Sequence, residues 1–176
     1  MAQNQTQTGT LKSYNPATGE LIGEVRSFTT AEAEEALARA RVAATTWANC
    51  GLPARLEIMK RFEEVLVEHA DELCRLISAE NGKPLTEAML TEVLPLIDLV
   101  SYFRKNAPSI LEDHTIPLHL MKNRKSFISY RPRGVMLVIS PWNFPFTIAG
   151  GSVVMGLIAG NVILHKPASL TPLIAV

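Results

Sequence analysis

The chain has 176 residues, of which 47% are hydrophobic, so it carries enough apolar side chain for one sizeable core. Its 17 basic residues balance 17 acidic ones, and this neutrality provides no chain-wide field that would attract nucleic acid or an anionic membrane. These values exclude a disordered chain and a polybasic binding protein. A ligand therefore has to be bound by a local site.

The start of the chain and its cysteines bear on the cellular setting. Residues 1–10 are polar and lack the basic start and apolar stretch of a secretory signal, which predicts a disordered tail and a cytoplasmic protein. Cys50 and Cys74 are too few for a disulfide scaffold and lack a metal-ligand spacing. We expect both to lie within helices as core or half-buried thiols, and we expect no metal site.

A hairpin and a capped helix are predicted next. Residues 11–14 and 21–25 flank a turn that contains proline and glycine, as two short antiparallel strands would. Thr29 and Glu32 have the spacing of a capping box, in which the two side chains satisfy free amides at a helix start. Alanines, a leucine and a tryptophan then recur at helical spacing.

Helical periodicity continues through the middle of the chain. One helix is expected to start at Pro53, a second to cover 70–80 and end at Gly82, and a third to start at Pro84 and kink at Pro95. In the first of these, the apolar face comprises Leu56, Met59, Phe62, Val65 and Leu66, and the opposite face comprises Arg55, Lys60, Glu63 and Glu64.

The segment near 114–133 changes to polar and β-favouring residues, which indicates extended strands or an arm. It contains the basic cluster of the chain, namely Lys122, Arg124, Lys125, Arg131 and Arg133. No interleaved aromatic residues or glycine-rich phosphate loop accompany these charges, which favours a solvated strand face over a nucleic-acid site.

No charged residue occurs between Arg133 and His165, and this stretch has two explanations. A membrane segment is one, because Gly156 and Gly160 have GxxxG spacing; however, prolines and asparagines break the run into pieces shorter than the roughly 20 residues needed to span a bilayer. The other explanation, a buried core, divides the stretch naturally into elements.

In the core interpretation, the stretch forms one βαβ unit. Residues 135–139 form an apolar strand of the kind that is covered on both faces in a parallel sheet, and residues 140–145 form a turn. A helix over 146–159 then leads to a second strand over 162–164. We expect a right-handed crossover.

Ligands of such sheets bind beyond the carboxyl ends of the strands, which places residues 140–144 and 165–169 side by side as the predicted site. Thr171 and Pro172 then predict the N-cap and first residue of a further helix.

The two usual nucleotide-binding fingerprints, GxGxxG and GxxxxGK[ST], are absent. Instead, Ser-Pro-Trp-Asn-Phe-Pro covers 140–145, Gly-Asn covers 160–161 and Lys-Pro-Ala-Ser-Leu-Thr-Pro covers 166–172; upstream, Asn-Pro-Ala-Thr-Gly-Glu covers 15–20 and Glu-Asn-Gly-Lys-Pro covers 80–84. This ordered set resembles the aldehyde dehydrogenase superfamily. The resemblance implies an α/β fold in which residues 11–176 form a truncated amino-terminal cofactor-binding region: amino-terminal helices plus the start of a Rossmann-like parallel sheet.

The resemblance also implies a reaction. In this family a cysteine thiolate attacks the aldehyde, hydride passes to NAD(P)+ and the resulting thioester is hydrolysed. Asn143 matches the asparagine whose amide stabilises the oxyanion, and its alternative interpretation is a turn-forming residue between two prolines.

Cofactor residues follow from the same motifs. Lys166 matches the lysine that hydrogen-bonds the adenosine ribose, and Trp142 either lines the cofactor cleft or anchors the core. Ser169 stands where NAD-preferring members often have glutamate, so we expect NADP+ to be accepted. His165 is assigned no catalytic role. The full predicted cofactor set is Ile139, Ser140, Pro141, Trp142, Asn143, Lys166, Pro167, Ala168 and Ser169.

The family's nucleophilic cysteine and general-base glutamate have no counterpart in these 176 residues. Cys74 lies in an amphipathic helical pattern without an activating base. We therefore expect the chain alone to be inactive and to be part of a longer homo-oligomeric enzyme. A non-catalytic binding module and a small membrane protein are the alternatives, and nothing in the sequence selects the aldehyde.

Overall fold

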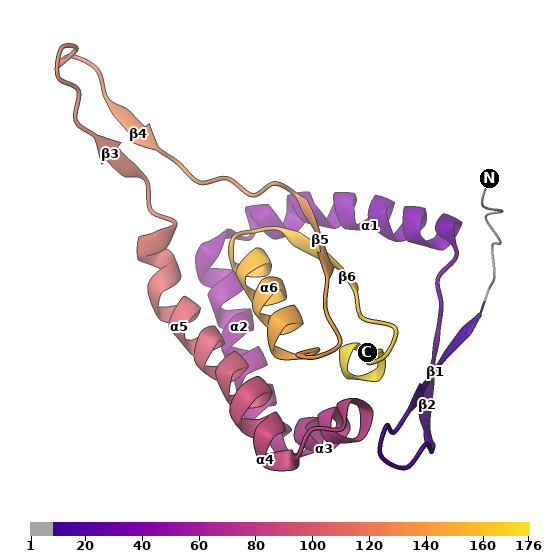
Figure 1. Ribbon diagram of the computed structural model, residues 1–176. Helices are drawn as coiled ribbons and strands as arrows, with labels where there is room; N and C mark the ends of the chain where they lie inside the picture. The colour runs from indigo at the N-terminus through magenta and orange to yellow at the C-terminus, as the bar shows by residue number, and fades with distance from the viewer. Residues whose placement is uncertain (1–8) are drawn as a thin grey trace.

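The computed structural model describes residues 9–176 and confirms a mixed α/β chain (Figure 1). Of the predicted tail, residues 1–8 lie outside the described residues, and Thr10 already belongs to the first strand. The elements, in order, are β1 (Thr10–Tyr14), β2 (Leu21–Arg26), α1 (Thr30–Asn49), α2 (Gly51–Glu68), α3 (Ala70–Asn81), α4 (Leu85–Ala88), the π-helical η1 (Met89–Val93), α5 (Leu94–Ile110), β3 (His114–Ile116), β4 (Ser126–Ile128), β5 (Val135–Ile139), α6 (Thr147–Ile158), β6 (Val162–Lys166) and the 3₁₀ turn η2 (Leu173–Ala175).

The predicted hairpin and capping box are both present. Strands β1 and β2 pair antiparallel, and the Thr29 hydroxyl accepts from the Glu32 amide while the Glu32 carboxylate accepts from the Thr29 amide. The Thr29 backbone bond, together with Arg26, lowers the pKa of Glu32 to about 2. The first helix is therefore fixed by its own local sequence.

The main core lies among α2, α5 and α6, which pack against one another in Figure 1. Its fully buried members are Met59, Leu66, Leu96, Val100, Ala107, Val154 and Ile158. Two assignments on α2 are wrong. Val65 is 49% exposed, whereas Arg55, expected on the charged face, is buried. The reason is that the Arg55 Nε donates to Ile158 O at 3.0 Å, so the guanidinium satisfies a free carbonyl at the carboxyl end of α6.

Helix junctions also differ from expectation at two places. Helix α2 begins at Gly51 rather than Pro53, because Gly51 adopts a φ of +80° that lets α2 follow α1 almost directly. Cys50 therefore lies exposed between two helices, whereas Cys74 is buried as expected. At Pro95, a π-helical turn precedes α5 in place of a kink within one helix, and Pro95 stands in the first turn, where a missing amide is tolerated.

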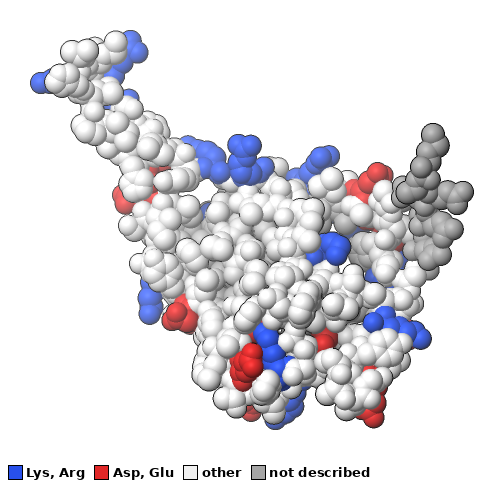
Figure 2. Space-filling model, in the orientation of Figure 1, with Lys and Arg blue, Asp and Glu red and all other residues white. Residues whose placement is uncertain are grey.

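The predicted arm is formed by β3 and β4, which pair antiparallel and project away from the helices (Figure 1). Figure 2 shows lysine and arginine side chains gathered at its tip. Large apolar side chains are exposed along the same arm, among them Leu120 at 88% and Phe127 at 57%.

The uncharged stretch forms the predicted βαβ unit. Strands β5 and β6 pair in parallel, from Val135 opposite Val162 to Ile139 opposite Lys166, and α6 connects them. Coverage of β5 on both faces was wrong: Leu137 and Ile139 are 64% and 65% exposed, because the described elements cover only one face. Among residues 9–176, no helix has both the length and the apolarity to cross a bilayer, and α6 itself has 12 residues.

Two glycines of α6 provide a matched test of close packing. A Cβ on Gly150 would lie 2.5 Å from a methyl group of Leu96, which is 1% exposed, whereas a Cβ on Gly151 would meet Leu99 at an ordinary 3.8 Å. We expect Gly150→Ala to lower the free energy of unfolding by about 1–3 kcal/mol. Gly151→Ala should be neutral or stabilising by up to about 1 kcal/mol. Urea unfolding of both variants checks this; equal effects would contradict the packing.

Candidate functional site

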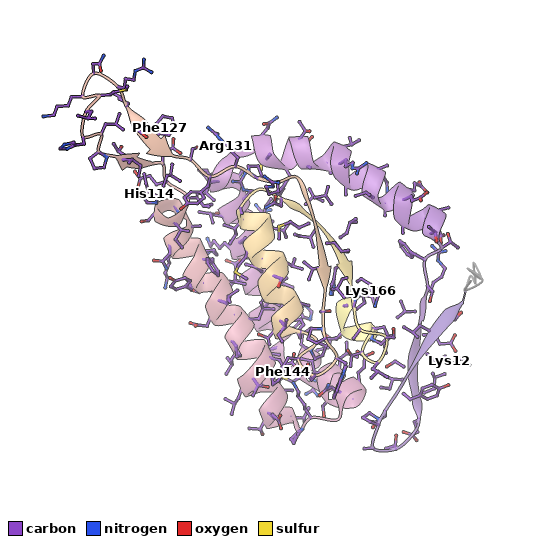
Figure 3. All side chains as sticks on the ribbon, turned by 45° about the horizontal axis from the view of Figure 1, so that its top comes forward. Lys12, His114, Phe127, Arg131, Phe144 and Lys166 are labelled. Atoms are coloured by element: carbon purple, nitrogen blue, oxygen red, sulfur yellow. The ribbon has the colours of Figure 1, made fainter. Side chains whose placement is uncertain are left out.

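The two predicted loops meet at the carboxyl end of the β5–β6 pair. Ile139 pairs with Lys166, the Ser140 amide donates to Lys166 O at 3.2 Å, and Ser140 Oγ lies 2.8 Å from His165 Nε2. Figure 3 shows Lys166 and Phe144 at this end of the sheet. The loops expected to lie side by side are therefore joined by hydrogen bonds.

The predicted site residues differ in exposure. Ile139, Trp142, Asn143, Lys166 and Ser169 are exposed, Pro141, Pro167 and Ala168 are half-buried, and Ser140 is buried. Trp142 is 56% exposed, so within the described chain it is not a core anchor. The side chains able to contact a ligand thus lie on the surface around the end of the sheet.

Lys166 and His165 are adjacent but differ in chemical state. The Lys166 ammonium donates to Pro167 O at 3.1 Å, which uses one of its three donors. Burial lowers the pKa of His165, which favours the neutral ring, and its Nε2 lies within hydrogen-bond distance of Ser140 Oγ. Lys166 can contact a polar ligand, whereas His165 supports the loop.

The amino terminus of α6 is occupied by a carboxylate from another part of the chain. Glu92 in η1, fully buried, accepts from the amides of Phe146 at 2.8 Å and Thr147 at 3.2 Å. It is also paired with Lys83, whose ammonium lies 3.8 Å from the centre of the Phe144 ring. These helix amides are therefore not available to bind a phosphate.

A second buried carboxylate fixes the end of the other loop. Glu80 accepts from the amides of Leu173 at 2.8 Å and Ile174 at 2.9 Å, and from the Ser13 hydroxyl at 2.8 Å. The predicted N-cap, Thr171, was wrong: its hydroxyl is buried and has no hydrogen-bond partner among residues 9–176. A carboxylate with two acceptor oxygens performs the capping instead.

The stretch from Glu80 to Lys83 was recognised only as a motif, and its contacts with the site were missed. Asn81 Nδ2 donates to Trp142 O at 2.7 Å. A signal for Glu80 exists in the sequence, since it follows Cys74 and Ile77 at three-residue intervals on the buried face of α3. A charged residue in an apolar stripe requires a buried partner, which the sequence does not identify.

Asn161 fixes the entrance to β5. Its Oδ1 accepts from the amides of Arg133 at 2.7 Å and Gly134 at 3.0 Å, and its Nδ2 donates to Gly156 O at 3.3 Å. Sequence reasoning assigned it only to the exit of α6. Its side chain links the end of the arm to the βαβ unit.

Two surface hollows lie away from these loops. One is beside Cys74 between α3 and α4, and the other surrounds the Glu63–Arg104 ion pair between α2 and α5. Neither is lined by a residue of 139–145 or 165–169. The candidate site at the sheet edge is thus separate from both hollows.

Known proteins share this arrangement of helices and strands. A family model described as the aldehyde dehydrogenase family matches residues 3–176. The chain belongs to the aldehyde dehydrogenase family. The resemblance noted in the sequence is thereby confirmed, as is the α/β fold class.

Curated aldehyde dehydrogenases align along nearly all of this chain. The mitochondrial succinate-semialdehyde dehydrogenase of Arabidopsis thaliana is 36% identical over 166 residues, which covers 94% of this chain and 31% of that protein. The glutarate-semialdehyde dehydrogenase of Pseudomonas putida is 37% identical over 163 residues, covering 93% and 33%. The chain thus spans about a third of the length of these relatives.

Solved structures of similar proteins have the same fold, among them an aldehyde dehydrogenase. The enzyme of Brucella melitensis biovar abortus 2308 superposes with a TM-score of 0.89 at 32% identity, covering 95% of this chain and 34% of that one. PnpE in complex with nicotinamide adenine dinucleotide gives 0.87 at 28% identity, covering 95% and 34%. GapN of Methanocaldococcus jannaschii complexed with NADP gives 0.84 at 25%, covering 98% and 36%.

The buried Lys83–Glu92 pair supports a stability prediction. Glu92→Gln leaves the Lys83 ammonium, 9% exposed, without its counter-charge, which should lower the free energy of unfolding by about 3–5 kcal/mol. Glu87→Gln removes an exposed carboxylate nearby and should change it by less than about 0.5 kcal/mol. Chemical denaturation distinguishes the two; equal stabilities would contradict the assigned role of Glu92.

Proposed function

We propose that this chain forms part of an NAD(P)+-dependent aldehyde dehydrogenase that oxidises an aldehyde to a carboxylic acid. In this proposal residues 11–176 are the amino-terminal cofactor-binding region. The observation that carries it is the meeting of the two loops at the sheet end, with exposed Asn143 on one and exposed Lys166 on the other. Its support is family membership together with this placement.

The loops have groups suited to a dinucleotide. The Lys166 ammonium has donors left for ribose hydroxyls, and Ile139, Pro141 and Trp142 offer partly or fully exposed apolar surface. Because Glu92 already occupies the first amides of α6, the phosphates would bind elsewhere. When bound, the nicotinamide accepts hydride from the substrate carbon.

Asn143 is the proposed catalytic residue of this chain. Its side-chain amide is a neutral donor that can be directed at the oxygen on which negative charge develops. Both neighbours of Asn143 are held, since Asn81 donates to the Trp142 carbonyl and Lys83 lies over the Phe144 ring. An exposed amide on a fixed backbone suits an oxyanion donor, because a preorganised donor needs little reorganisation during reaction.

Neither cysteine of the sequence suits the nucleophile. Burial raises the pKa of Cys74, which disfavours the reactive thiolate. Cys50 contacts Trp47 O, and Trp47 donates to Leu157 O at the far end of α6, about 18 Å of helix from the Asn143 loop. We infer that these 176 residues alone do not oxidise aldehydes.

The decisive experiment uses the complete protein encoded by the reading frame that contains this sequence. NAD(P)H formation is measured with succinate and glutarate semialdehydes and with aliphatic and aromatic aldehydes. We expect activity in the complete protein and a loss of about 10²- to 10³-fold in kcat for Asn143→Ala. Asn49→Ala, at the exposed end of α1, is the control and should retain full activity. An inactive complete protein would contradict the proposed function.

Cofactor preference depends on Ser169 in this proposal. The exposed hydroxyl of Ser169 would not repel a ribose 2′-phosphate, so NADP+ should bind. Ser169→Glu adds a like charge and should weaken NADP+ binding by about tenfold or more with little effect on NAD+. Ser109→Glu adds the same charge on α5 and controls for net charge. Cofactor titration by fluorescence is the measurement; NAD+ binding at least about tenfold tighter than NADP+ in the wild type would contradict the prediction.

We also propose that the complete protein is a homo-oligomer. The exposed apolar side chains of the arm, including Leu120 and Phe127, favour burial against another protein surface. The cytoplasmic location expected from the sequence remains a prediction, and the Arabidopsis relative is mitochondrial by name.

A further inference from the structure

The peptide bond that joins Trp142 to Asn143 is held by a side chain from outside the loop. Asn81 Nδ2 donates to Trp142 O at 2.7 Å, across 61 residues of sequence. That carbonyl lies in the same planar peptide unit as the Asn143 amide nitrogen. The hydrogen bond therefore restricts the rotation of the backbone immediately before the proposed oxyanion donor.

Asn81 itself occupies a rigid position. It is the last residue of α3, and the following Gly82 ends the helix with a φ of +84° and an amide that donates to Ser78 O. Gly82 also lies against the turn after β1, where a Cβ in its place would be 2.9 Å from Pro16 Cγ. The preceding residue, Glu80, is buried and hydrogen-bonded. The donor thus has little freedom to follow a moving loop.

The backbone after Asn143 is restrained by the same stretch of chain. Lys83 lies over the Phe144 ring, and Glu92 accepts from the Phe146 amide. The Asn143 side chain is exposed, so the orientation of its amide depends on the backbone that carries it. Asn81 is the one of these three groups that acts on the peptide unit of Asn143 itself.

We propose that Asn81 is a positioning residue for Asn143, an inference that rests on the proposed function. Without the Asn81 donor, the Trp142–Asn143 peptide unit can rotate. The side-chain amide of Asn143, which that backbone carries, then loses its fixed direction. Displacements of about 1 Å at a reacting centre can cost about 100-fold in rate, so a single hydrogen bond at this point has a measurable kinetic effect.

The test uses the complete protein with Asn81→Ala and Asn81→Asp. The aspartate keeps the shape of the side chain but replaces the donor with an acceptor, so it separates hydrogen bonding from packing. We expect both variants to lower kcat by about tenfold or more, with the dissociation constant for NAD(P)+ changed by less than about twofold. Asn106→Ala is the matched control, because Asn106 also donates at 2.7 Å to a carbonyl, that of Tyr102, but on α5.

A double-mutant cycle distinguishes positioning from general stability. If Asn81 acts through Asn143, adding Asn81→Asp to Asn143→Ala should lower kcat no further than Asn143→Ala alone. If Asn81→Asp lowers kcat by the same factor in the wild type and in Asn143→Ala, the proposal is overturned. A wild-type kcat in both Asn81 variants would also overturn it. An inactive wild type contradicts the proposed function, whereas an active wild type with indifferent Asn81 variants contradicts only the positioning role.

Discussion

The buried carboxylate of Glu92 connects the two halves of the described chain. It lies in the π-helical turn before α5, carries the counter-charge of Lys83, and accepts from the first amides of α6. Burying such a charge is costly unless ion pairing and hydrogen bonding compensate, and here both do. The position of the site loop between β5 and α6 depends on this arrangement, because the loop ends at those amides.

Glu80 provides a second connection of the same kind. It holds the amides after the second site loop and a hydroxyl of β1, so the amino-terminal hairpin, α3 and the carboxyl-terminal turn meet at one carboxylate. Glu80 lies on α3 and Glu92 on η1, and each accepts from backbone amides that follow one of the two loops. The amino-terminal half thus acts as the support on which the sheet edge is built.

The sequence correctly predicted the elements that have strong local signals. The predictions were wrong where contacts with residues far away in the chain determine whether a side chain is buried. The hairpin, the capping box at Thr29, the end of α3 at Gly82 and the βαβ unit each depend on nearby residues, and each was confirmed. Arg55 was misplaced because the carbonyl that accepts from its Nε belongs to Ile158, 103 residues away at the end of α6.

The candidate site was also predictable only in part. The meeting of the two loops could be predicted because parallel strands place their carboxyl ends at one edge. The cap after Thr171 and the contact from Asn81 to Trp142 could not, since they join segments far apart in the chain. The spacing of apolar residues predicts which face of a helix is buried, but it does not predict which polar group a buried carboxylate on that face will bind.

The ends of α6 have a consequence for how the chain folds during synthesis. The helix has no side-chain cap of its own at its start, where Glu92 binds its amides, and its final carbonyls accept from Trp47 and Arg55. All three of these residues precede α6 in the chain and leave the ribosome before it. The apolar α6 segment therefore emerges after the groups that bind its two termini have been synthesised. This order shortens the time for which its backbone groups are unpaired and able to aggregate with other chains.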